Sequence, residues 1–118
     1  MNSRNNIIVD KSKAFALKII SLYKYLIAEK REYVLSKQLL RSGTSIGANV
    51  REAVRGQSKA DFYSKMSISL KEASETEYWL ELLYESQYID RLQFDSIYPD
   101  CQELIRILVA IVKTKDRK

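Results

Sequence analysis

The chain contains no histidine, one cysteine, one proline and three glycines among its 118 residues. Without histidine it cannot build a Ser-His-Asp or Cys-His catalytic site, or the Glu-x-x-His motif of di-iron helical bundles. Gly-rich phosphate loops and paired-cysteine zinc patterns are also missing. We therefore expect a protein that is not an enzyme and binds no metal and no cofactor. The single Cys101 cannot form an internal disulfide, which predicts a cytoplasmic location.

Long apolar runs are missing as well. The longest, residues 107–112, is far shorter than the roughly 18 residues that a membrane span needs. Residues 7–9 are too few for the apolar part of a signal peptide. We therefore expect no membrane contact and no signal peptide. So few glycines and prolines disfavour a many-stranded β fold and favour long helices in a single all-α domain spanning residues 1–118.

Apolar periodicity predicts four helices. The first begins at Asp10 or Ser12 and ends near Glu29, which leaves residues 1–9 as a loosely docked arm. A second begins at residue 34 or 35 and is capped by Gly56, expected in a left-handed conformation. The third runs over residues 59–86, beginning after Ser58. Its short connection to the second predicts an antiparallel hairpin.

The fourth helix follows Asp90, whose spacing to Gln93 is typical of a capping box. Pro99 removes a backbone donor, so we expect a kink or a restart of this helix near residues 96–99. Cys101 lies in its apolar stripe and is predicted to be a buried structural thiol. Residues 115–118 are expected to be flexible. The architecture predicted is an antiparallel, up-down-up-down four-helix bundle.

The second predicted helix, which includes residues 38–56, has three different faces. Its apolar stripe begins with Leu35 and is predicted to face the core. A second side carries Gly43 and Gly47, each of which costs a helix interior about 1 kcal/mol relative to Ala. Close approach of another helix, within the bundle or between subunits, would offset that cost. The apolar stripe consists of Leu35, Leu39, Ile46, Val50 and Ala53.

A polar stripe on the same helix is predicted to meet two carboxylates of the third helix. One interpretation is a buried polar network that fixes the register of the helices, because an unpaired member would be costly. The other is a ligand or subunit-contact site. A carboxylate-only metal site is disfavoured, since carboxylates beside an arginine favour ion pairs. The residues concerned are Arg41, Ser45, Asn49, Glu52, Glu72 and Glu75.

Charge is distributed unevenly along the chain. Residues 1–59 hold 12 Lys and Arg against 4 Asp and Glu, whereas residues 60–118 hold 8 against 11. This asymmetry fits a nucleic-acid face on the first two helices, head-to-tail pairing of unlike surfaces between subunits, or ordinary solvated helices. The candidate nucleic-acid-binding residues are Lys11, Lys18, Lys24, Lys30, Arg31, Lys37, Arg51, Arg55 and Lys59.

Two blocks, RSGTSIGANVREA at residues 41–53 and SKADFYSKMSISLKEASETEYWLELL at residues 58–83, resemble a known bacterial family. It is the four-helix-bundle family named after the open reading frame in intervening sequences of large-subunit ribosomal RNA genes. The resemblance implies an up-down-up-down bundle that assembles into a ring, typically a homopentamer. Matching pattern residues, for which the resemblance implies an architectural role, are Arg41, Ser42, Ser45, Asn49, Glu52, Glu72, Glu75 and Trp79.

The chain is similar also to the accessory variability determinant of diversity-generating retroelements, a basic pentameric barrel that binds nucleic acid and its reverse transcriptase. The expected function is therefore a non-enzymatic homo-oligomer that binds structured RNA or DNA through the first two helices. The alternative is a protein-interaction and assembly module with no direct nucleic-acid role.

Overall fold

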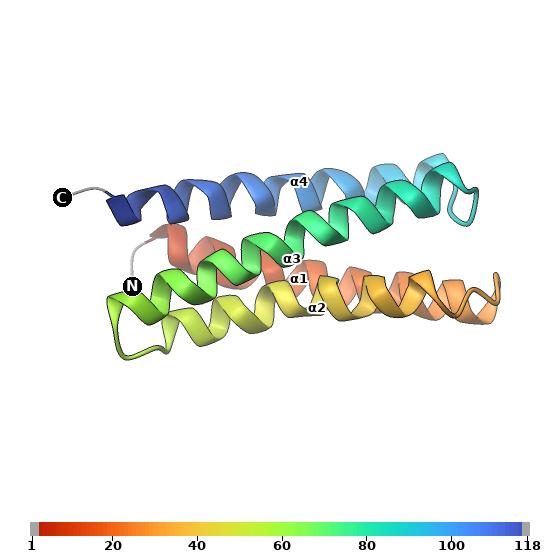
Figure 1. Cartoon of the computed structure of the whole chain (residues 1–118). Coiled ribbons are helices and arrows are strands. Elements are labelled where there is room, and N and C mark those ends of the chain that lie inside the picture. The colour runs from red at the N-terminus through yellow and green to blue at the C-terminus, as the bar shows by residue number, and fades with distance from the viewer. Residues whose placement is uncertain (1–2, 117–118) are drawn as a thin grey trace.

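The structure is a computed structural model that describes residues 3–116. No strand occurs within these residues, which confirms the all-α prediction. The helices lie side by side in an elongated bundle of 49 × 21 × 18 Å (Figure 1). Their bounds are α1 Ser3–Ala28, α2 Leu35–Val54, α3 Lys59–Glu85 and α4 Arg91–Lys113, followed by the short 3-10 helix η1 at Thr114–Asp116.

Each helix packs against two neighbours. Helix α1 contacts α2 and α4, and α3 contacts the same two helices from the other side. Figure 1 shows the turn between α2 and α3 at the opposite end of the bundle from the turn between α3 and α4. Because α2 lies between α1 and α3, its two flanks form two separate contacts. These contacts position the surfaces described below.

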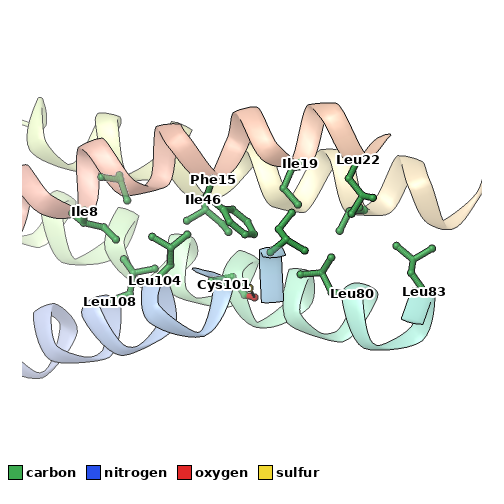
Figure 2. Packing of buried hydrophobic residues seen from close by; sticks show 14 of the residues in the cluster. Ile8, Phe15, Ile19, Leu22, Ile46, Leu80, Leu83, Cys101, Leu104 and Leu108 are labelled. Atoms are coloured by element: carbon green, nitrogen blue, oxygen red, sulfur yellow. Dashed lines mark hydrogen bonds between the residues drawn. The ribbon is translucent and has the colours of Figure 1, made fainter. Parts of the chain in front are cut away.

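The first turns of α1 correct one prediction. The helix begins at Ser3, not at Asp10 or Ser12, so residues 3–9 are not a loose arm. Ile8 is fully buried, and Figure 2 shows it on the inner side of α1, level with Leu104 and Leu108 of α4. Ile8 lies two turns before Phe15 and so extends the apolar stripe. At the other end, residues 115–116 belong to η1, and residues 1–2 and 117–118 lie outside the described part.

Two predicted helix starts are confirmed by their hydrogen bonds. The Ser58 hydroxyl accepts from the Asp61 amide at 3.0 Å, which caps α3. Asp90 and Gln93 form a complete capping box, in which each side chain accepts from the other residue's amide, at 2.8 and 2.9 Å. These bonds satisfy amides that have no partner inside the helix. Both sequence patterns therefore mark real helix starts.

The left-handed conformation expected at Gly56 is wrong. Among the described residues, positive φ occurs instead at Arg31 and Gln87, with φ of 51° and 69°. Gly56 meets a different requirement, since a Cβ atom there would overlap the carboxylate of Asp61. The turn between α2 and α3 thus uses glycine for space and not for a left-handed backbone.

Glu32 organises the turn between α1 and α2. Its buried carboxylate accepts hydrogen bonds from the amides of Val34, Leu35 and Ser36 at 2.8–3.1 Å. The Ser36 hydroxyl donates to the Glu32 carbonyl at 2.6 Å. A carboxylate at a helix N-terminus is favoured both by these donors and by the helix dipole. The connection between the first two predicted helices is therefore a specific cap for α2.

Helix α4 runs through Pro99 without interruption, so the predicted restart is wrong, and a kink stays a prediction. Proline removes the amide that would donate to the Asp95 carbonyl one turn earlier. In the same turn, Lys18 of α1 donates to the Ser96 carbonyl at 3.1 Å and pairs with Asp100. The contact between α1 and α4 thus holds both sides of Pro99.

Cys101 lies in the core among side chains from all four helices (Figure 2). Its thiol donates to the Ala73 carbonyl at 3.4 Å. Burial, with smaller contributions from Glu77, Asp100 and Glu81, raises the pKa of Cys101 to about 12. The predicted burial of this thiol is confirmed. Within residues 3–116, no helix has the length and apolar character that crossing a membrane requires.

Candidate functional site

Helices α1 and α2 meet at the two glycines of α2. A Cβ atom on Gly43 would lie 2.7–3.0 Å from side-chain atoms of Ile19, which is fully buried. At Gly47 the nearest atoms belong to Ser12 at 3.3–3.4 Å, an ordinary to slightly tight contact. The close helix contact expected at these glycines thus lies inside the bundle. We call this contact, formed by Ser12, Ile19, Gly43 and Gly47, the α1/α2 seam.

Helices α2 and α3 meet through hydroxyl groups. Ser69 of α3 donates to the Ile46 carbonyl at 2.8 Å, and the hydroxyls of Thr76 and Ser42 lie 2.8 Å apart. Ser42, Ser69 and Thr76 are fully buried. Their hydrogen bonds remove the cost of placing polar groups in the core. We call this contact, formed by Ser42, Ile46, Ser69 and Thr76, the α2/α3 seam.

Arg41 bridges two carboxylates above the α2/α3 seam. Its two terminal nitrogens contact Glu72 at 3.1 Å and Glu75 at 3.0 Å. The Arg41 side chain is 52% exposed, whereas that of Glu72 is only 12% exposed. A guanidinium suits this task because its donors form a planar fork. The structure thus brings together three of the six residues of the predicted network, at the surface and not in the core.

The other three residues of that network make separate contacts. Ser45 donates to the Arg41 carbonyl at 2.6 Å and Asn49 to the Ser45 carbonyl at 2.9 Å, both within α2. Glu52 pairs with Lys65 of α3 at 3.4 Å. The six residues therefore do not share one set of side-chain contacts, and their role in fixing the register of the helices stays a prediction. Ser45 and Asn49 satisfy themselves locally, because side chains on a helix reach the carbonyl one turn earlier.

Apolar and aromatic residues lie one helical turn from Glu72 and Glu75 along α3. Ile68 is 40% exposed and Tyr78 is 55% exposed, and they are two of seven exposed large hydrophobic residues within the described part of the chain. The buried indole nitrogen of Trp79 has no hydrogen-bond partner within the described chain, although such N–H groups usually find one. We call the surface formed by Arg41, Ile68, Glu72, Glu75 and Trp79, with Tyr78 at its edge, the α2/α3 face.

A groove of about 750 Å³ lies over the α1/α2 seam. Small residues from both helices form part of its lining, and basic side chains line it as well. Its α3 end carries Asp61 and the Glu52–Lys65 pair. We call this feature the α1/α2 groove. Its small residues include Ser12, Ala16, Gly47 and Ala48, and its unpaired basic residues are Lys13, Arg51 and Arg55.

The nine predicted nucleic-acid-binding residues do not form one surface. Lys11 pairs with Glu103 at 3.2 Å and Lys18 with Asp100, so both belong to the contact with α4. Arg51 and Arg55 line the α1/α2 groove. Lys30 lines a different pocket that includes Tyr25, Tyr84 and Tyr88. The remaining four, which are exposed, are Lys24, Arg31, Lys37 and Lys59.

Lys13 is the basic residue of the groove that has no ion pair within the described residues and that the predicted nucleic-acid-binding set omits. It lies about three helical turns before Lys24, which places the two lysines on one side of α1. A second pattern also marks this region: residues 11–28 and residues 35–51 contain no Asp or Glu. Cations on α1 and α2 therefore have no acidic partner within those segments. Within residues 3–116, no group of three or more His, Cys, Asp or Glu is placed to hold a metal ion.

Together these features define a four-helix-bundle protein with a basic groove on one side of α2 and a mixed charged and aromatic face on the other. The chain matches the model of the 23S rRNA-intervening sequence protein family over residues 4–110 and belongs to that family.

One solved structure is closely similar along almost the whole chain. It is a protein with unknown function from the S23 ribosomal protein family of Bacteroides thetaiotaomicron VPI-5482. The two sequences are 56% identical, the TM-score is 0.91, and the match covers 94% of this chain and 99% of that one. No curated protein matches the chain.

Proposed function

We propose that this protein is a non-enzymatic, homo-oligomeric bundle of the cytoplasm that binds structured RNA or DNA through the basic surface of α1 and α2. The observation that carries the proposal is the α1/α2 groove, where Lys13, Arg51 and Arg55 form no ion pair within residues 5–116. Binding of phosphates requires only such a cluster of cations.

The geometry of α2 suits a phosphate backbone. Arg51 and Arg55 are one turn apart, which places their guanidinium groups on one side of the helix with a rise of about 6 Å between their Cα atoms. A guanidinium can donate two parallel hydrogen bonds to one phosphate. Because acidic residues are absent from residues 35–51, little negative charge opposes the ligand there. Binding should therefore be sensitive to salt.

Fluorescence anisotropy with a labelled, structured RNA tests this function. Raising salt from about 50 to about 200 mM should weaken binding at least tenfold, since several counterions are released on binding. Arg51→Glu combined with Arg55→Glu should weaken it by a further factor of about ten or more. Lys71→Glu with Arg106→Glu is the matched control, because both residues are exposed and lie on α3 and α4.

Two outcomes contradict the proposal at different levels. Absence of binding by the unchanged protein at low salt rejects the nucleic-acid function. Equal weakening by the two charge-reversed pairs rejects only the assignment to α1 and α2, since net charge alone would then explain the loss. Circular dichroism should show the same helix content for all variants.

Self-assembly is the second function that a specific observation favours. The exposed Ile68 and Tyr78 and the unpaired indole of Trp79 make the α2/α3 face a candidate subunit contact. The ring expected from the family resemblance would be a pentamer. A nucleic-acid enzyme such as a reverse transcriptase is a further candidate partner. If assembly instead pairs the basic surface of one subunit with the acidic surface of the next, reversing Arg51 and Arg55 should alter oligomer size or partner capture. In that case the unchanged protein should show no nucleic-acid affinity.

A further inference from the structure

We infer that the α1/α2 groove holds the sugar–phosphate backbone of a duplex segment and makes no contact with the bases. This inference rests on the proposed function and names the part of the nucleic acid that the groove recognises. It is carried by three properties of the groove: its depth, its lack of aromatic residues and the arrangement of its charges.

Small side chains make room in the groove, and this room is what is meant by its depth. Gly47 and Ala48 of α2 and Ala16 of α1 line it where a larger residue would fill the space. Gly47 also lets Ser12 approach α2, with contacts of 3.3–3.4 Å to the position of a Cβ atom. A volume of about 750 Å³ lies within the range of ligand sites in proteins. The small side chains therefore leave room for a phosphate backbone between α1 and α2.

No aromatic residue is among the described residues that line the groove. Recognition of unpaired bases depends mainly on stacking against aromatic side chains. The tyrosines that could stack, Tyr25, Tyr84 and Tyr88, line a separate pocket instead. What the groove offers is cationic donors for phosphate oxygens. It is thus suited to a backbone whose bases are already paired with each other.

Acidic and basic residues are distributed unevenly along the groove. Asp61 and Glu52 line its α3 end, where Lys65 pairs with Glu52 at 3.4 Å. Lys13, Arg51 and Arg55 have no such partner among the residues that the structure describes. Phosphates would be repelled from Asp61 and attracted to the unpaired cations. The backbone should therefore follow the Lys13 and Arg51 side of the groove.

Ala48 offers the sharpest test because it is exposed, lines the groove and lies within a helix. Ala48→Glu adds a carboxylate at the centre of the site, and Ala48→Gln adds nearly the same volume without charge. Both residues are good helix formers, so the fold should persist. Ser74→Glu, at an exposed position of α3, adds the same charge away from the groove. The probes are two labelled RNA duplexes of unrelated sequence and one unstructured single strand of equal length.

We expect Ala48→Glu to weaken duplex binding about tenfold, because a carboxylate within a Debye length of the cations opposes phosphate. Ala48→Gln and Ser74→Glu should keep a duplex affinity within about threefold of the unchanged protein, and the two duplexes should bind within about threefold of each other.

The inference is overturned if the unchanged protein binds duplex but Ala48→Glu and Ala48→Gln differ in duplex affinity by less than about threefold. That result leaves the proposed function intact. Single-strand binding about tenfold tighter than duplex binding also overturns it. Absence of all binding overturns both.

Discussion

The two flanks of α2 are held to their neighbours by different means. The α1/α2 seam closes because Gly43 and Gly47 have no side chain, whereas the α2/α3 seam closes around the hydroxyls of Ser42, Ser69 and Thr76. The surfaces above the seams differ in the same way. Arg41 is paired above the α2/α3 seam, whereas Lys13, Arg51 and Arg55 above the α1/α2 seam form no ion pair within the described residues. The α2/α3 seam is thus held by hydrogen bonds between buried groups, and the α1/α2 seam carries the cations to which we assign the proposed phosphate contacts.

The largest effect should come from filling the α1/α2 seam. Gly43→Leu must displace Ile19, which is fully buried and would lie within 3.0 Å of the first added carbon. Overpacking of this kind typically costs about 1–3 kcal/mol, and we expect the free energy of unfolding in urea to fall by about 3 kcal/mol because leucine adds several atoms. A variant as stable as the unchanged protein would show that α1 and α2 do not approach as closely as described.

Gly47→Ala is the matched control for that experiment. The added carbon meets Ser12 at 3.3–3.4 Å, so the neighbour needs to move little. Alanine also gains about 1 kcal/mol of helix propensity over glycine. The two effects oppose each other, and the net change in unfolding free energy should be less than about 1 kcal/mol.

A smaller effect is expected from the α2/α3 seam. Thr76→Val keeps the shape of the side chain but leaves the Ser42 hydroxyl buried without its partner. An unsatisfied buried hydroxyl costs about 1–3 kcal/mol, so the unfolding free energy should fall by about 1–2 kcal/mol. Adding Ser42→Ala should recover part of this loss, because the unsatisfied group is then gone. A double variant that loses the full sum of the single losses would show that the two hydroxyls do not interact.

Sequence patterns that depend on one helix were sufficient to predict much of the fold. The capping pair Asp90 and Gln93, the start of α3 at Ser58 and the buried Cys101 all follow from local spacing. The start of α1 was misplaced because Asp10 looked like a cap, although Ile8 continues the apolar stripe through it. A local cap preference of about 1 kcal/mol is easily outweighed by burial of an isoleucine, worth about 1.5–3 kcal/mol.

Contacts between neighbouring helices could not be predicted from local spacing in the same way. A single helix shows that Lys11 and Lys18 lie on one side, but not that Glu103 and Asp100 of α4 stand opposite. Glu32 looks like a loop residue until the turn brings three amides to its carboxylate. Glu52 pairs with Lys65 because of the register between α2 and α3. Each of these contacts is fixed by tertiary packing, which a single sequence does not reveal.

The smallest effect on the fold should come from Arg41→Met. The Arg41 side chain is half exposed, and exposed ion pairs contribute about 0–1 kcal/mol. Because Glu72 is only 12% exposed and loses a partner, we expect the unfolding free energy to fall by about 1 kcal/mol, the upper end of that range. Methionine retains the apolar stem, which separates the loss of charge from the loss of packing. If the α2/α3 face joins subunits, Glu72 and Glu75 lose their counter-charge at that contact, and light scattering should report a smaller assembly. A stable variant with a smaller assembly would assign the bridge to self-association. Reduced stability with unchanged assembly would make it a clamp within the bundle, and no change in either would mean that only the hydroxyls beneath it hold α2 to α3.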